Sequence, residues 1–207
     1  MSPKSVDAVE RSVDSMQNIY AVVIALAISQ AIEGLLKDLL KQQGGMNTFD
    51  FDQLFLRIPA FVAFSFTVVP FWHGMNRHLD RCYIEKDGRV VRHALAFDFT
   101  MFFVEAILLF AAAWLLKSGI GSFAALGLLL CIDMLWGRIS HHIHFRGEPK
   151  SHVVKWSTIN LIAIGLALLV IFIPAGARLW VLMGVAIARG AVDNFLCRDF
   201  YFPKEAS

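Results

Sequence analysis

Seven histidines are the residues of this chain best suited to chemistry at neutral pH, because an imidazole can change its charge or ligate a metal ion near pH 7. The densest run, His141-His142-Ile143-His144, ends an apolar segment, and the others lie at or near the ends of similar segments. We expect all of them on the same side of a membrane. The seven are His73, His78, His93, His141, His142, His144 and His152.

A metal or haem site is one chemistry that such histidines suggest. The candidate ligands are His73, His78, His141, His142 and His144. A zinc site needs three or four ligands, and the sequence has no Cys-x-x-Cys or His-Glu-x-x-His motif. A haem would need histidines at matching depth in two facing helices, and only His73 lies clearly inside an apolar segment. We predict no metal and no cofactor, and keep a His-based metal-binding protein or enzyme as the alternative.

Recognition of an anion, or of pH, is a second chemistry open to this region. Histidine and arginine together attract the phosphates of a nucleotide, a nucleic acid or a lipid headgroup. A positively charged loop region with extra histidines is the competing interpretation. The predicted anion- or pH-sensing face consists of His73, Asn76, Arg77, His78, Arg81, His141, His142, His144 and Arg146.

Ionisable residues inside apolar segments form a third group, and they normally face protein or a water-filled cavity. Arg189 and Asp193 are four residues apart and share a helix face, with Asp133 expected at similar depth. They would form a gate or a structural lock. The other acids could attract a cation or proton, or stay neutral and hydrogen-bonded. The predicted polar path or gate consists of Glu33, Asp98, Glu105, Asp133, Arg189 and Asp193.

Apolar segments of membrane-spanning length must position these residues. The chain is 57% hydrophobic and 17% charged, against about 45–50% and about 25% in soluble domains. A helix crosses a bilayer with about 20 apolar residues, and six segments qualify: 20–40, 57–77, 94–116, 119–140, 155–174 and 179–197. The sequence therefore predicts an all-α, polytopic membrane protein of three helical hairpins, with a polar N-terminal segment (1–19), a six-helix domain (20–197) and a C-terminal tail (198–207).

The distribution of positive charge predicts the orientation. Thirteen Lys and Arg residues fall on the side of the two termini, and five on the other side. The more positive side normally faces the cytoplasm. Both termini are therefore predicted to be cytoplasmic, in the cell (inner) membrane, and the absence of a cysteine pairing pattern agrees with a reducing compartment.

An internal repeat is one interpretation of the second, fourth and sixth spans, which end in similar polar stretches. Asn76, Ser140 and Asn194 align in these stretches, while Glu33 and Glu105 align in the first and third spans. A helical hairpin used three times would explain both alignments, and repeat interfaces often hold the working site of membrane proteins. Similar helix ends facing the same headgroups would explain them equally.

A resemblance to a known family is limited to one stretch. Ser65-Phe66 and Trp72 in the second span, within six helices, resemble the small six-helix potassium channels of lysosomes and bacteria. The Arg-x-x-x-Phe-Ser-Asp motif of those channels is absent, and the spacing from Trp to His in this span differs. We therefore assign no family and carry over no site residue.

The favoured function is a membrane ion channel or small transporter assembled as a homo-oligomer. No Gly-rich phosphate loop and no Gly-x-Ser-x-Gly elbow is present, so we predict no catalytic residues and favour a protein that is not an enzyme. The expected partners are the lipid bilayer, other copies of the chain and a cytoplasmic anionic ligand. The alternatives are the His-based metal protein or enzyme and a non-conducting scaffold subunit.

Overall fold

The computed structural model describes residues 3–37, 39–43, 46–85, 92–144 and 151–202 of the 207-residue chain. The long helices are α1 (Pro3–Leu36), α2 (Phe51–Leu79), α3 (Arg92–Trp114), α4 (Ile120–His144), α5 (Ser151–Leu169) and α6 (Ala175–Leu196). The short elements are β1 (Leu40–Gln43), β2 (Met46–Phe49), the π-helix η1 (Asp80–Ile84), the 3₁₀ helices η2 (Leu115–Ser118) and η3 (Val170–Phe172), and α7 (Arg198–Tyr201).

Within the described residues, six helices are long and apolar enough to cross a membrane. The prediction of a helical, multi-pass membrane protein with six spans is confirmed at this level. The first helix begins at Pro3, well before the expected start at residue 20. Residues 8–19 continue the helix because Val13 and Met16 extend the buried stripe that Tyr20 and Ile24 begin.

A β-hairpin that the sequence did not predict joins α1 to α2. Strands β1 and β2 are antiparallel, with Leu40 opposite Phe49 and Gln43 opposite Met46. The next helix begins at Phe51, and the carboxylate of its N-cap residue Asp50 accepts a hydrogen bond from the Gln53 backbone N–H at 3.2 Å. Such an N-cap satisfies a backbone N–H that has no partner inside the helix.

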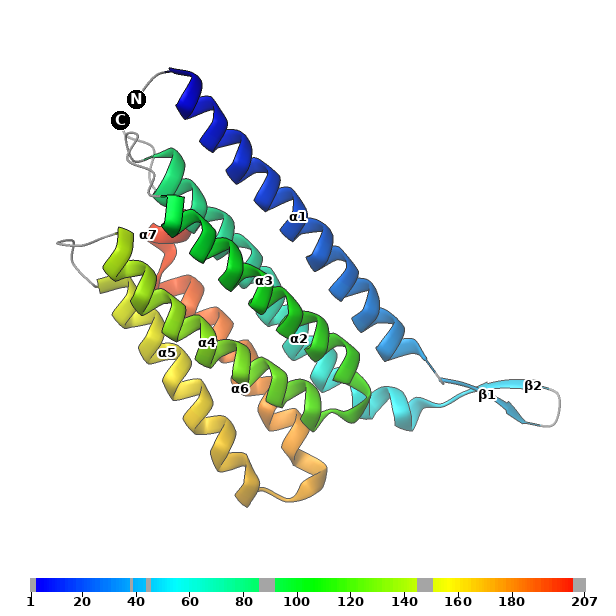
Figure 1. The fold of residues 1–207 in the computed structure, drawn as a ribbon. Coiled ribbons are helices and arrows are strands. Elements are labelled where there is room, and N and C mark those ends of the chain that lie inside the picture. The colour runs from blue at the N-terminus through cyan, green and yellow to red at the C-terminus, as the bar shows by residue number, and fades with distance from the viewer. Residues whose placement is uncertain (1–2, 38, 44–45, 86–91, 145–150, 203–207) are drawn as a thin grey trace.

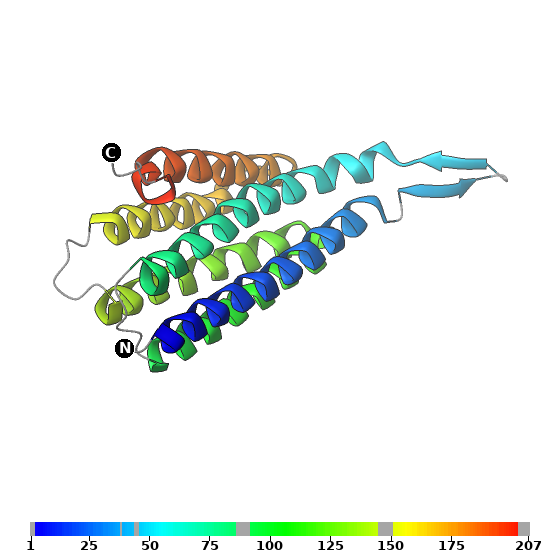
Figure 2. The same cartoon turned by 90° about the horizontal axis from the view of Figure 1, so that it is seen from above.

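The six helices form one bundle with two distinct ends (Figures 1 and 2). The first turn of α1 and the short α7 lie at one end, which is the terminal end. The hairpin of β1 and β2 extends from the opposite end, which is the hairpin end. Helix α1 packs on α2 and α3, α3 packs on α4, α2 packs on α6, and α5 packs on α4 and α6.

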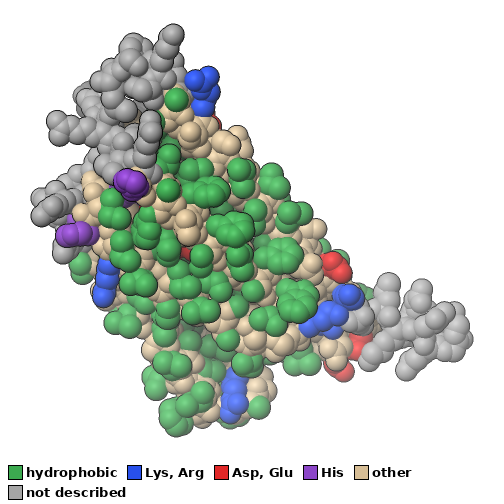
Figure 3. All heavy atoms as spheres, in the orientation of Figure 1, with side chains coloured by type: hydrophobic (Ala, Val, Ile, Leu, Met, Phe, Trp, Pro, Cys, Tyr) green, Lys and Arg blue, Asp and Glu red, His purple; other side chains and the backbone are tan. Residues whose placement is uncertain are grey.

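Small and apolar side chains fill the hairpin half of the bundle. Ala60, Ala112 and Ala113 are fully buried there, together with Leu109 and Leu116. Small side chains let helix backbones approach closely in a membrane protein. The outer flank is also apolar, and charged and histidine side chains gather towards the two ends (Figure 3), as expected for a lipid-facing surface.

Candidate functional site

A cavity of about 130 Å³ lies inside the bundle, among α2, α3, α4, α5 and α6. Its lining begins with Arg81 and Phe200 at the terminal end and reaches Glu105 and Asp133 deeper in the bundle. Glu105 is thirteen residues into α3, which places it about 20 Å along that helix. The cavity therefore reaches from the terminal end towards the middle of the spans.

A charged cluster that joins three helices lies at the inner part of this cavity. Arg189 of α6 donates from Nε to Asn160 Oδ1 of α5 at 2.9 Å. Asn160 Nδ2 donates to Asp133 Oδ2 of α4 at 3.4 Å. Arg189 also pairs with Asp193 one turn along α6, with Nη2 and Oδ2 3.7 Å apart. All four side chains are buried, and Asn160 and Asp193 are 0% exposed.

Glu105 of α3 extends this cluster to a fourth helix through its contact with Asp133. Its carboxyl and that of Asp133 share a side-chain hydrogen bond, which requires a proton on one of the two groups. Glu105 is 1% exposed, and its Oε1 has no hydrogen-bond partner among the described residues. Arg189 Nη1 and Asp193 Oδ1 are likewise buried without a partner there. The inner part of the cavity therefore combines three carboxyl groups with the guanidinium of Arg189 and unsatisfied polar atoms of both signs, and Arg81 adds a second guanidinium at the terminal end.

Helix α7 folds back over the cavity from its terminal side. The Tyr201 hydroxyl donates to Asp193 Oδ2 at 2.9 Å, and Gly74 leaves room for the ring, since a Cβ there would lie 3.2 Å from Tyr201 Cε1. Burial, together with the Asp193 carboxylate, raises the pKa of Tyr201 above its usual value. The same two causes raise the pKa of the Cys197 thiol to about 12. Both groups therefore stay protonated at neutral pH.

A second polar cluster surrounds Asp98 near the start of α3. The Tyr83 hydroxyl donates to Asp98 Oδ2 at 2.7 Å, and Trp136 Nε1 donates to Oδ1 at 3.0 Å. The Nε2 atoms of His144 and His78 lie 3.0 Å and 3.4 Å from Oδ2. Asp98 is 0% exposed. These contacts therefore compensate for the water that the carboxylate loses when it is buried.

The π-helix η1 explains why neighbouring residues of the second span both turn inward. The Glu85 N–H bonds to the Asp80 carbonyl five residues earlier, at 2.8 Å. A single wide turn of this kind changes the register of the side chains and is frequent at functional sites. Cys82 and Tyr83 are consecutive, and both are buried.

Of the predicted polar path, the structure brings together Glu105, Asp133, Arg189 and Asp193. Asp98 is buried as well, but its hydrogen bonds belong to the second cluster. Glu33 does not join either group. Its side chain is 59% exposed and lies 3.7 Å from Lys37, one turn along α1. The face of α1 that packs in the bundle carries Ala27 and Ala31 instead, so Glu33 points outward. The alignment of Glu33 with Glu105 in the repeat interpretation therefore does not correspond to equivalent positions in the bundle.

The predicted anion- or pH-sensing face is partly used inside the molecule. Arg77 pairs with Glu85 and donates from Nε to the Phe200 carbonyl at 3.1 Å. His73 lies 3.2 Å from the Tyr201 carbonyl oxygen, so these two side chains hold α7 in place. Asn76 and Arg81 are half-buried, His141 is buried and His142 is exposed, while Arg146 and the side chain of His152 lie outside the described residues.

Several contributors to the two clusters were missed at the level of sequence. Asn160 is a polar residue inside the fifth span, but its bridging role depends on α5 packing against both α4 and α6. Tyr201 lies in the segment assigned to a tail. Cys82 follows His78 by four residues, and this spacing could have paired them on one helix face.

The fold and these clusters define a multi-pass membrane protein with a charged cavity in its interior. No protein-family model matches the chain, and neither a curated protein nor a solved structure is significantly similar to it. Its function therefore has to follow from the side chains themselves.

Proposed function

We propose that the protein moves a small cation, in the simplest case a proton, across the membrane through the charged cavity. The observation that carries this proposal is that the cavity reaches from the terminal end to the buried carboxyl groups of Glu105 and Asp133. Ionisable groups are costly in a membrane interior and commonly mark ion pathways and proton relays. In the inner part of the cavity three acids, Glu105, Asp133 and Asp193, face one arginine, Arg189, so this part favours positive charge.

The bond between the Glu105 and Asp133 carboxyls supports a proton as the simplest cargo. Two carboxyls that interact this closely titrate as a pair, so the pair as a whole holds or releases the shared proton. Arg189 can balance the remaining negative charge, because Asn160 holds its guanidinium beside Asp133 and Asp193. This arrangement would keep the net charge of the cluster small in either state.

The closed hairpin half favours a transporter over an open pore through one bundle. Leu109, Ala113 and Leu116 are fully buried beyond Glu105. An ion crossing the bundle would have to pass this apolar layer, so a second conformation would be needed. We propose, from the charge bias, that the terminal end faces the cytoplasm of a cell (inner) membrane. Assembly as a homo-oligomer and sensing of a cytoplasmic anion or of pH remain hypotheses from the sequence.

Ion flux into liposomes tests the proposal. Purified protein is reconstituted, a proton or potassium gradient is imposed, and flux is followed with a pH-sensitive or potential-sensitive dye. We expect flux with the wild type and its loss in Glu105→Gln. The matched control is Glu33→Gln, which removes an exposed carboxylate of the same type and should leave flux unchanged. Absence of wild-type flux under every gradient, or equal flux in Glu105→Gln, would contradict the proposal.

A further inference from the structure

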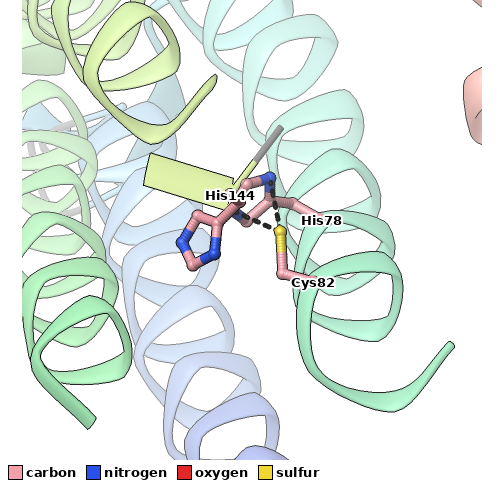
Figure 4. Close-up of side chains that lie close together, drawn as sticks. All are labelled: His78, Cys82 and His144. Atoms are coloured by element: carbon pink, nitrogen blue, oxygen red, sulfur yellow. Dashed lines mark hydrogen bonds between the residues drawn. The ribbon is translucent and has the colours of Figure 1, made fainter. Parts of the chain in front are cut away.

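Three side chains with metal-binding atoms converge at the terminal end, beside the charged cavity. They are His78 of α2, Cys82 of η1 and His144 at the end of α4, and Figure 4 shows them gathered together. One ligand atom from each lies within 4.8 Å of those of the other two. Among the described residues, no other group of three or more His, Cys, Asp or Glu side chains has its ligand atoms this close together.

One separation among these atoms is close to that around a tetrahedral ion, and the other two are no longer than 4.8 Å. Zinc bonds of about 2.0 Å to nitrogen and about 2.3 Å to sulfur place neighbouring ligand atoms about 3.3–3.8 Å apart. His78 Nε2 and Cys82 Sγ are 3.4 Å apart. The Asp98 Oδ2 atom lies 3.4 Å from His78 Nε2 and 3.0 Å from His144 Nε2. His78, Cys82 and His144 form the group within 4.8 Å, and Asp98, which is close to both imidazoles, would have to move towards Cys82 to complete a set of four donors.

Partners that would orient the ligands are already in place. Trp136 Nε1 donates to the second oxygen of the Asp98 carboxylate at 3.0 Å, and the Tyr83 hydroxyl donates to Oδ2 at 2.7 Å. Metal sites depend on such outer hydrogen bonds, which fix the direction of a ligating carboxylate or imidazole. The π-helix η1 contributes as well, because it lets both Cys82 and Tyr83 face the bundle.

The kind of ion follows from the donors and their charge. Imidazole and thiolate suit zinc and similar late first-row ions, whereas magnesium and calcium prefer sites built from oxygen. One thiolate, one carboxylate and two neutral imidazoles together carry two negative charges, which a divalent ion cancels. A neutral assembly is the least costly one in a buried position.

We propose that His78, Cys82 and His144 bind a late first-row divalent metal ion such as Zn²⁺, with Asp98 as the fourth donor. The Cys82 thiol loses its proton to solvent on binding, and its sulfur forms the bond to the metal. The ion would tie α2, α3 and α4 together at the terminal end. This site goes beyond the proposed ion transport and does not depend on it.

Spectroscopic titration with Co²⁺ tests the site directly. The full chain in detergent micelles is treated with a chelator, the chelator is removed, and Co²⁺ is added as a coloured substitute for Zn²⁺. We expect one equivalent to produce the visible bands of tetrahedral Co²⁺ and a thiolate-to-cobalt charge-transfer band. Zn²⁺ should displace the cobalt and abolish both signals. No ion gradient is involved, so this result and the flux result can succeed or fail separately.

Paired variants assign the ligands. Cys82→Ser should abolish the charge-transfer band, whereas Cys131→Ser changes an exposed cysteine of α4 and should keep it. His144→Gln should weaken Zn²⁺ binding, measured in competition with a chromophoric chelator, and exposed His142→Gln should not. Trp136→Phe removes the hydrogen bond to Asp98 and part of the ring that packs on His78, and should weaken Zn²⁺ binding by about 10–100-fold.

Two results would overturn the proposal: a wild type that binds neither Co²⁺ nor Zn²⁺ with one-to-one stoichiometry, and Cys82→Ser and His144→Gln variants with wild-type affinity. If a ligand variant fails to fold, the double variant Cys131→Ser/Cys197→Ser tests whether Cys82 is a ligand, because Cys82 is then the one cysteine left in the chain. A charge-transfer band in this double variant supports Cys82 as a ligand, and loss of the band in a folded protein refutes it.

Discussion

Replacing Asn160 with leucine should cost about 2–3 kcal/mol of unfolding free energy. Asn160 is the polar link from α5 to both of its neighbours, since it accepts from Arg189 at 2.9 Å and donates to Asp133 at 3.4 Å. A hydrogen bond to a charged group contributes about 1.5–3 kcal/mol. The longer bond to Asp133 should add less, because interhelical bonds in membranes average about 0.6 kcal/mol.

Leucine has the branching and the number of side-chain heavy atoms of asparagine and a somewhat larger volume, so the change leaves no empty space. The gain from a more apolar side chain should also be small, because lipid is the alternative environment and is as apolar as the bundle interior. The loss of stability should therefore report the two hydrogen bonds. The assay is reversible unfolding in mixed micelles of increasing SDS fraction, followed by far-UV circular dichroism.

Thr158→Leu on the same helix is the matched control, because Thr158 is exposed. Its effect should stay within about 0.5 kcal/mol. The double variant Asn160→Leu/Arg189→Met should cost less than the sum of the single changes, by about 0.5–3 kcal/mol, because the two side chains contact each other. An Asn160→Leu protein as stable as the wild type, or strict additivity with Arg189→Met, would refute the linking role.

Two further predictions concern the wall and the mouth of the cavity. A Cβ on Gly137 would lie 2.5 Å from Trp156 Cζ3, so Gly137→Ala should displace Trp156, alter tryptophan fluorescence and destabilise the protein by about 1–3 kcal/mol. The control is Gly127→Ala on the same helix, where a Cβ meets no atom within 4 Å, and this change should be neutral or slightly stabilising. Equal effects of the two changes would contradict the packing of Trp156 on Gly137. The raised pKa of about 12 at Cys197 keeps its thiol protonated below that pH, so maleimide labelling, measured by mass spectrometry in a chain whose other two cysteines are serine, should be slow at pH 8 and rise with pH. The Asp193→Asn variant removes a charge that raises the pKa of Cys197, so the pKa of this thiol should fall and labelling at pH 8 should become faster. An unchanged pH profile would show that the Asp193 carboxylate does not act on the thiol.

The helical class and the number of spans were predictable because they depend on local sequence. About 20 consecutive apolar residues satisfy the bilayer wherever they occur in the chain. The pairing of Arg189 with Asp193 was predictable for a similar reason, since residues four apart share one face of a helix. The limits of the helices were less well predicted. The first helix extends to Pro3 because its buried stripe continues through a segment that is polar on average.

Glu33 and Glu105 show where local sequence stops being informative. Each is an acid in an apolar stretch, and the sequence gives no reason to separate them. The structure leaves Glu33 exposed beside Lys37 and buries Glu105 beside Asp133. Their difference depends on which face of each helix meets its neighbours, and that is fixed by the packing of small residues across helices.

The sequence by itself determined that this is a membrane-spanning helical protein with ionisable groups in its interior, because hydropathy and helical spacing are properties of short segments. Only the tertiary structure decided which of these groups meet. His78 and His144 are 66 positions apart in the sequence and reach the same oxygen of Asp98, while Asn160 joins Asp133 to Arg189 across three helices. Such contacts depend on the packing of helices that are distant in the chain, and hydrogen-bonding capacity alone does not specify the partner.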